Sequence, residues 1–222
     1  MKWRKRGAMS FAIGKRQALR DGLAQSEPAH EPSAGDPGLG FRLALGYLLL
    51  SAVGIGLSLL VRGASPFTHP DPWLALPPVV AASGSVAMGV AMAFGLTFVT
   101  RLSALRFDWA SRLCSELRPF ARSLTPGQVL LVAGLSSLGE ELLFRGFLLP
   151  LVGILASSAI FGFAHQMRGP SRWIWIAWAT TAGLLFGAAF RLTGSLVGPL
   201  VAHALTNAAN LGFLKTYEPA KR

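Results

Sequence analysis

Charged residues are scarce in this chain of 222 residues: they make up 14% of it, whereas 52% is apolar. This balance is unusual for a protein that dissolves in water, and it favours a membrane protein with room for one domain. The net charge of +11 could indicate a nucleic-acid partner. A nucleic-acid-binding surface, however, places its basic residues on a folded soluble face among polar and aromatic readers. Here the basic residues fall between long apolar runs, so we expect a lipid bilayer and no nucleic acid as partner.

Cysteine-based sites and the signatures of two other protease classes are also missing. The single cysteine, Cys114, excludes an internal disulfide framework and a zinc site built on cysteines, and it fits a thiol that faces a reducing compartment. The HExxH pattern of zinc proteases of the site-2 type is absent. Ser83 resembles part of a rhomboid serine motif, but the leading glycine and the histidine dyad are missing. Close helix packing by small residues explains this stretch better.

The N-terminal residues lack a cleavable signal peptide, because no apolar run with a small-residue cleavage site directly follows the basic start. Residues 21–40 lack apolar bulk and periodicity, which is typical of a linker that cannot offset the entropy of ordering. We therefore expect residues 1–40 to be a basic flexible arm and linker. Residues 41–214 form the predicted membrane domain, and 215–222 the predicted cytoplasmic tail.

Long apolar segments make up most of the remaining chain. A membrane-spanning helix needs roughly twenty mainly apolar residues, because each residue rises about 1.5 Å. The runs lack the strict alternation of a closed barrel, so we predict an all-α, polytopic helical bundle. Its six expected spans are Leu43–Val61, Trp73–Thr100, Gly127–Phe147, Pro150–His165, Trp173–Arg191 and Ser195–Leu214. The second is long enough to tilt or to start at the interface around Pro77 and Pro78.

The distribution of positive charge predicts the orientation of this bundle, because Lys and Arg gather in cytoplasmic loops. With six spans, the basic arm, the 101–124 segment, the loop with Arg168 and Arg172 and the C-terminal tail fall on one side, and we place both termini in the cytoplasm. The 101–124 segment has leucines and a tryptophan at helical spacing, which predicts an amphipathic helix. It would lie on the membrane surface, or serve as a connector whose apolar face packs on the bundle.

Ionisable side chains inside an apolar span cost roughly 2.5 to 3.5 kcal/mol each and need a reason. The run Gly139–Gly146, GEELLFRG, contains three of them. Glu141 and Arg145 are four residues apart on a helix, in the order that suits an ion pair. Glu140 lies about 100° round the helix from Glu141 and has no evident partner in its own segment.

Two histidines and an asparagine in other spans could supply that partner. A lone histidine in an apolar helix is usually a packing residue. His165, His203 and Asn207 together with Glu140, however, would be costly on three separate segments unless they met in one polar cavity. A carboxylate with an imidazole can hold and deprotonate a water, while an amide with a second imidazole can stabilise an oxyanion. The reaction class that follows is hydrolysis of an amide bond.

Three motifs carry a family resemblance: Glu140-Glu141-x-x-x-Arg145, Phe161-x-x-x-His165 and His203-x-x-x-Asn207. In type, order and spacing they resemble the motifs of the CAAX prenyl protease and bacteriocin-processing (CPBP, or Abi) family of glutamic-type intramembrane endopeptidases. The resemblance covers roughly residues 125–214, the expected catalytic core. It implies that Glu140 and His165 activate water, that His203 and Asn207 stabilise the oxyanion, and that Glu141 and Arg145 support them.

The same resemblance implies a substrate and a location. The substrate would be a membrane-anchored protein or peptide, cleaved near its C-terminus or beside a membrane segment, and the enzyme would lie in a bacterial inner membrane. The composition also resembles that of bacterial members that process sorted C-terminal tails, such as the myxosortases. Members were long described as metalloproteases, so zinc on Glu140, His165 and His203 is an alternative. We favour a mechanism without metal or other cofactor.

Two further functions fit the polar cluster. A non-catalytic membrane scaffold, or a protein of the bacteriocin-immunity type, could keep it to hold its helices together. A proton-coupled transporter also uses intramembrane Glu and His.

Overall fold

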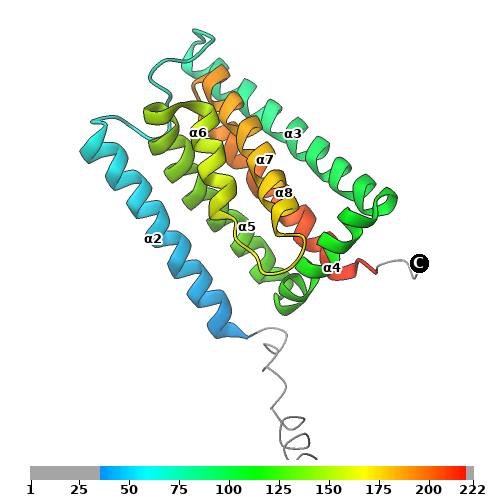
Figure 1. Cartoon of the computed structure of the whole chain (residues 1–222). Helices are drawn as coiled ribbons and strands as arrows, with labels where there is room; N and C mark the ends of the chain where they lie inside the picture. Colours follow the sequence, from blue (N-terminus) through cyan, green and yellow to red (C-terminus); the bar gives the residue numbers. More distant parts are fainter. Residues whose placement is uncertain (1–35, 219–222) are drawn as a thin grey trace, which may run out of the picture. The chain divides into compact units, whose positions relative to one another are not determined.

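The computed structural model describes residues 36–218 as a helical bundle (Figure 1). Over this range the only β pairing is an isolated bridge between Thr68 and Ser195. The predicted all-α class is therefore confirmed, whereas the predictions for residues 1–35 and 219–222 lie outside the described residues. The elements are α2 (Pro37–Val61), α3 (Pro78–Arg106), α4 (Asp108–Ser123), α5 (Pro126–Glu140), the π-helix η1 (Glu141–Leu148), α6 (Leu149–Ala164), α7 (Arg172–Thr193) and α8 (Val197–Thr216).

Four helical stretches of the described chain are long and apolar enough to cross a membrane: Gly38–Val61, Pro78–Arg106, Pro126–Ala164 and Arg172–Thr193. The third contains two of the six expected spans. It is broken at Gly153, whose φ of 80° lies in the left-handed region that favours glycine. Beyond this break α6 packs on η1, and the Ser157 hydroxyl donates to the Phe144 carbonyl at 2.9 Å. The sixth expected span is α8, which is helical but is not one of the four.

Three predicted boundaries need comment. The linker was expected to reach residue 40, whereas α2 begins at Pro37, with Asp36 as its N-cap. The second span, given as Trp73–Thr100, begins at Pro78, which agrees with the alternative start around Pro77 and Pro78. Trp73 and Leu74 instead donate their backbone N–H groups to carbonyls at the end of α7. The amphipathic helix was expected over 101–124, yet α3 continues to Arg106. Phe107 then adopts an extended backbone and separates it from α4.

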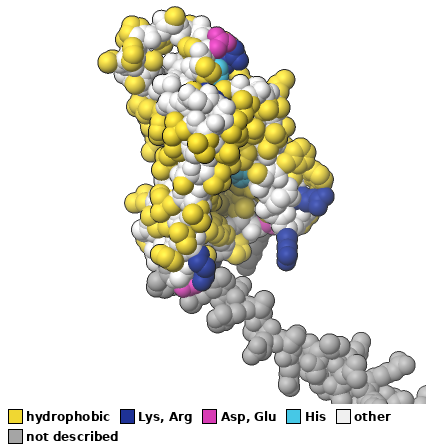
Figure 2. Space-filling view, turned by 90° about the vertical axis from the view of Figure 1, so that its left-hand side faces the viewer, with side chains coloured by type: hydrophobic (Ala, Val, Ile, Leu, Met, Phe, Trp, Pro, Cys, Tyr) yellow, Lys and Arg dark blue, Asp and Glu magenta, His cyan; other side chains and the backbone are white. Residues whose placement is uncertain are grey.

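Large apolar side chains cover the outer faces of the helices. Figure 2 shows this on one face, where hydrophobic side chains dominate and charged ones lie toward the ends. Leu60, Phe94 and Leu155 are examples, with 87%, 74% and 77% of their surface exposed. A folded protein that displays so much apolar surface along its helices needs an apolar surrounding. Together with the membrane-length helices, this identifies an integral membrane protein.

The amphipathic helix α4 packs its apolar face on the bundle. Cys114 and Ala121 form a buried cluster with Ala104 of α3 and with Leu214 and Tyr217 at the end of α8. The Tyr217 hydroxyl donates to the Ser111 hydroxyl of α4 at 2.9 Å. The connector interpretation therefore describes this helix, and α4 is fixed against the helix that carries His203.

Helices α3 and α8 approach each other backbone to backbone. A Cβ atom at Gly89 would collide with the carbonyl oxygen of Gly198, and one at Gly198 would collide with Ser85. The Ser85 hydroxyl accepts from the Gly198 N–H at 2.9 Å and donates to the Ser195 carbonyl at 3.0 Å. This contact fixes the beginning of α8, which sets the depth of the side chains that follow along it.

We expect Gly89→Ala to destabilise the protein, because the new methyl group meets backbone that cannot move without separating the two helices. Overpacking of this kind typically costs about 1–3 kcal/mol. Gly95→Ala is the matched control, since its methyl group would enter open space on the same helix. Thermal unfolding in detergent should show a lower Tm for the first variant only. Equal Tm values would contradict the close approach.

Candidate active site

The two adjacent glutamates lie where α5 passes into a π-helix. Glu140 ends α5 and Glu141 begins η1, which runs for eight residues. π-Helices are rare, usually a single turn long, and frequent at functional sites. Helix α2 supports this junction closely: a Cβ atom at Gly139 would come within 2.9 Å of the Tyr47 carbonyl, and one at Gly54 within 2.8 Å of the Leu143 backbone.

The predicted ion pair between Glu141 and Arg145 is present and wholly buried. Arg145 Nη1 donates to Glu141 Oε1 at 2.9 Å, and the two side chains are 0% and 1% exposed. The guanidinium also lies over the Phe161 ring, with 4.1 Å from its central carbon to the ring centre. These contacts compensate for the loss of water around the arginine.

Glu141 has a second contact that sequence reasoning missed. Its Oε1 lies 2.8 Å from Nδ1 of His203, which is on α8 and only 6% exposed. A carboxylate accepts hydrogen bonds, so Nδ1 of His203 carries the proton and the ring presents Nε2 on its other side. The residues are 62 positions apart, and no local pattern indicates that they meet.

His165 is held in the same way. It follows the last residue of α6, and its Nδ1 lies 2.8 Å from the Phe161 carbonyl. Since a carbonyl accepts, Nδ1 again carries the proton and Nε2 is the nitrogen that points elsewhere. Its ring contacts Trp175 of α7 edge to face, with 5.9 Å between the ring centres.

Both Nε2 atoms approach one oxygen of Glu140. Glu140 Oε2 lies 3.5 Å from Nε2 of His165 and 3.7 Å from Nε2 of His203. This oxygen is buried and has no hydrogen-bond partner among the described residues. When both imidazoles are neutral, their two Nε2 atoms and Glu140 Oε2 are three acceptors that face one another. A small proton donor such as water, placed between them, would supply hydrogen bonds to these acceptors.

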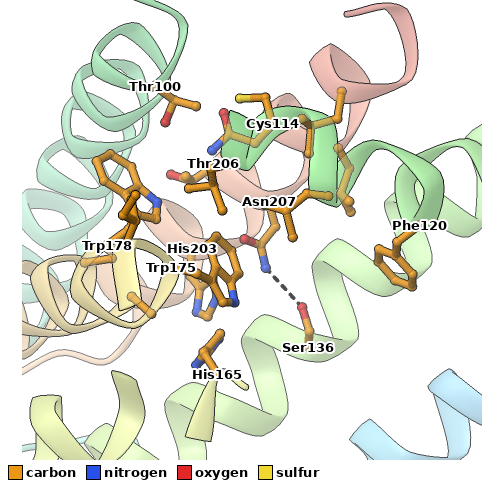
Figure 3. Close-up of a pocket in the computed structure, with 18 of the residues that line it drawn as sticks. Thr100, Cys114, Phe120, Ser136, His165, Trp175, Trp178, His203, Thr206 and Asn207 are labelled. Carbon is orange, nitrogen blue, oxygen red and sulfur yellow. Dashed lines mark hydrogen bonds between the residues drawn. The ribbon is translucent and has the colours of Figure 1, made fainter. Parts of the chain in front are cut away.

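Asn207 lies one helical turn beyond His203. Its side-chain amide donates to the Ser136 hydroxyl at 3.2 Å, as Figure 3 shows. Ser136 was missed in the sequence, although its place four residues before Glu140 puts it on the same helical face. The contact fixes the amide of Asn207 between α5 and α8.

One cavity of about 260 Å³ joins these groups. Glu140, His165, His203 and Asn207 line it, whereas Glu141 and Arg145 lie behind its wall. The rest of the lining is mostly apolar and includes side chains from α4 and α7. The structure therefore brings the four expected catalytic side chains to one cavity, and it makes α4 a wall of that cavity.

Zinc ligation was the alternative expected for Glu140, His165 and His203, and carboxylate and imidazole are suitable ligands. Among the residues that the structure describes, however, no group of three or more His, Cys, Asp or Glu side chains is arranged to hold a metal ion. The steps proposed below therefore use only side chains of the chain itself.

Comparisons with known proteins agree with the three motifs. Residues 122–209, which contain all six site residues, match the family model described as type II CAAX prenyl endopeptidase Rce1-like. The resemblance inferred from the sequence is confirmed. The chain is also 35% identical over 74 residues to the uncharacterized protein YpbD of Bacillus subtilis (strain 168). That alignment covers 33% of this chain and 39% of its relative. No solved structure matches the chain.

We expect Arg145→Met to destabilise the protein strongly, because it leaves the Glu141 carboxylate buried without its cation. Breaking a buried ion pair in this way costs about 3–5 kcal/mol. Arg191→Met is the matched control, because it removes an exposed pair with Asp71 that is worth about 0–1 kcal/mol. Unfolding measured in detergent should separate the two variants. The double variant Glu141→Gln/Arg145→Met should be more stable than Arg145→Met alone, and a less stable double variant would contradict the pairing.

Proposed function

We propose that this chain, whose residues 122–209 match the type II CAAX prenyl endopeptidases, is an intramembrane endopeptidase. Its substrate is a membrane-anchored protein, cleaved near its C-terminus or beside a membrane segment. One observation carries the proposal: two imidazoles with anchored Nδ1 atoms point their Nε2 atoms at the unpartnered Oε2 of a buried glutamate. Protease function in general is supported by the family match.

Water activation is the first step. A water between Glu140 and the two imidazoles gives one proton to the Glu140 carboxylate while its oxygen attacks the substrate carbonyl. His165 orients this water through Nε2. Positioned general bases contribute typically 10²- to 10⁴-fold to the rate.

Oxyanion stabilisation is the second step. Attack turns the carbonyl oxygen into an oxyanion, which accepts from the Asn207 amide and from His203 Nε2–H. Because Nδ1–H of His203 already donates to Glu141, this second donor requires the imidazolium form, which takes its additional proton from the solvent before attack. Donors of this kind are worth about 10²- to 10³-fold each. The proton held by Glu140 then passes to the leaving amine, which completes hydrolysis. Glu141 and Arg145 do not touch the substrate; they hold His203 through Nδ1.

The orientation belongs to the proposal as well. We place the enzyme in a bacterial inner membrane with both termini in the cytoplasm. The supporting observation is that basic segments gather at one end of the bundle. Lys215 donates to the Ala121 and Leu124 carbonyls at the end of α4, and Ser171, beside Arg172, binds Glu116 of the same helix. The division into an arm (1–40, whose last four residues form the first turn of α2), a membrane domain (41–214, with its catalytic core at 125–214) and a tail (215–222) is part of the same proposal.

Glu140→Gln tests the proposed function. The amide keeps the shape of the carboxylate but cannot take a proton, so we expect cleavage to fall at least about 10³-fold while Tm changes little. The measurement compares C-terminal fragments of membrane-anchored proteins between cells that make wild-type protein and cells that make the variant, and is repeated with purified protein in lipid vesicles. Glu218→Gln, at an exposed carboxylate, is the control.

Three outcomes of this experiment would contradict the proposal. Full activity of purified Glu140→Gln protein would show that Glu140 is not the general base. Loss of function only in proportion to unfolded protein would favour the scaffold or immunity function. Substrate flux in sealed vesicles without a cleavage product would favour the transporter.

The role of metal is tested separately. We expect cleavage to survive metal chelators, with no stoichiometric metal found in the active protein by elemental analysis. Activity that is lost on chelation and restored only by zinc would instead make Glu140, His165 and His203 metal ligands.

A further inference from the structure

Helix α8 carries two polar residues on the catalytic face that the proposed mechanism does not use. Thr206 and Asn210 follow His203 at three and seven residues, the spacing of one helical face, and both line the catalytic cavity. Figure 3 shows Thr206 directed toward Thr100, on the side of the cavity away from His165. The polar stripe therefore extends from the catalytic side chains toward α3 and α4.

The polar atoms of these two residues are buried without a partner. Thr206 is 6% exposed, and neither its hydroxyl nor the Asn210 Oδ1 atom has a hydrogen-bond partner among the described residues. Two other polar side chains of the cavity have partners within the chain: Asn207 donates to Ser136, and the Thr100 hydroxyl donates to the Leu96 carbonyl at 2.9 Å. Buried polar groups in native proteins nearly always have partners, so these two need one from outside the chain.

A peptide group has the chemistry that this pair lacks. The Thr206 hydroxyl can donate to a carbonyl oxygen, and Asn210 Oδ1 can accept from an N–H. A main-chain amide supplies one of each, whereas an acyl chain or an apolar side chain supplies neither. The apolar cavity walls around the pair strengthen such hydrogen bonds by excluding water.

We propose that Thr206 and Asn210 form a subsite for the main chain of the substrate. This inference rests on the proposed endopeptidase function. Asn210 lies about 10 Å along α8 from His203, since each residue rises 1.5 Å. An extended peptide covers that length with about three residues. The subsite therefore binds a peptide group within about three residues of the scissile bond, and it does so whatever the side chains of the substrate.

The test measures binding without cleavage. The full chain carrying Glu140→Gln is placed in lipid vesicles, and the probe is a dansyl-labelled decapeptide of alanine and leucine, capped at both ends. Trp175 and Trp178 line the cavity and serve as energy donors to the dansyl group. We expect Thr206→Val and Asn210→Leu each to raise Kd about five- to tenfold, the effect of losing one hydrogen bond. Thr100→Val is the matched control and should leave Kd unchanged, because its hydroxyl is already bound within α3.

A second set of probes separates a main-chain contact from a structural role. Each amide of the decapeptide is replaced in turn by an ester, which removes one N–H donor. At one position the ester should weaken binding to the parent protein about as much as Asn210→Leu does, and it should cost nothing further in Asn210→Leu. A purely structural role for Asn210 would make the two effects multiply at every position. Thr206→Val should also keep or raise Tm, because its hydroxyl has no partner to lose.

Three results would overturn the subsite: no transfer to the probe, unchanged Kd in both variants, or independent ester and Asn210 effects at all positions. Unchanged Kd would mean that ordered water satisfies these atoms, and independent effects would mean that Asn210 has a purely structural role. The fate of the protease function is distinguishable. Peptide binding through the subsite by a wild-type protein that cleaves nothing would retain the subsite and reject the protease. If wild-type protein cleaves its substrate, and Thr206→Val and Asn210→Leu leave that cleavage unchanged, the protease function is retained and the subsite is rejected.

Discussion

The buried carboxylate of Glu141 is the centre on which the site depends. It binds Arg145 on its own helix and His203 on α8 through a single oxygen. An isolated charge at this depth would be very costly, and the cation one turn away makes it tolerable. With the charge secured, the carboxylate can fix a histidine that is 62 residues distant in sequence. The side chain that performs no chemistry in the proposed mechanism thus determines how the reactive ones are presented.

Aromatic packing completes this arrangement. Phe161 lies beneath the Arg145 guanidinium, and its carbonyl anchors His165. Phe186 stacks on His203 with 5.2 Å between the ring centres. Each histidine is therefore held by one hydrogen bond and by ring contacts, which leaves its Nε2 atom free to face Glu140. The geometry is set by surroundings that are rigid and apolar, and such preorganisation is where much of an enzyme's rate enhancement originates.

Local patterns predicted part of this site, and distant contacts account for what they missed. The ion pair of Glu141 and Arg145 follows from four-residue spacing, and the gathering of Glu140 with His165, His203 and Asn207 follows from the cost of burying each alone. The contact of Glu141 with His203, and that of Asn207 with Ser136, depend on how α5 and α8 are placed against each other. No periodicity contains that information.

In the fold, too, local patterns predicted one part and distant contacts determined the rest. Hydropathy predicted the helices, but it could not decide between Trp73 and Pro78 as the start of the second span; the backbone of Trp73 pairs with the end of α7, and the helix begins at Pro78. The residues between Trp73 and Pro78 are apolar, yet Leu74 uses its N–H in a contact with α7 and Leu76 donates to the Leu74 carbonyl, so this segment is a turn and not a helix. Nor did hydropathy predict the π-helix, since the change from α to π hydrogen bonding leaves the apolar pattern of the segment intact.

The glycine contact between α3 and α8 has a consequence for exchanging segments between this chain and a relative. Gly198 lies inside the segment that matches the family model, residues 122–209, whereas Gly89 lies outside it. A side chain at either position collides with backbone of the other helix: one at Gly89 meets the Gly198 carbonyl, and one at Gly198 meets the Ser85 backbone. A chimera that receives residues 122–209 from a relative would therefore fold well only if the new α8 still fits closely against the original α3. The part of the molecule outside the matched segment is therefore constrained by the part inside it where α3 and α8 meet.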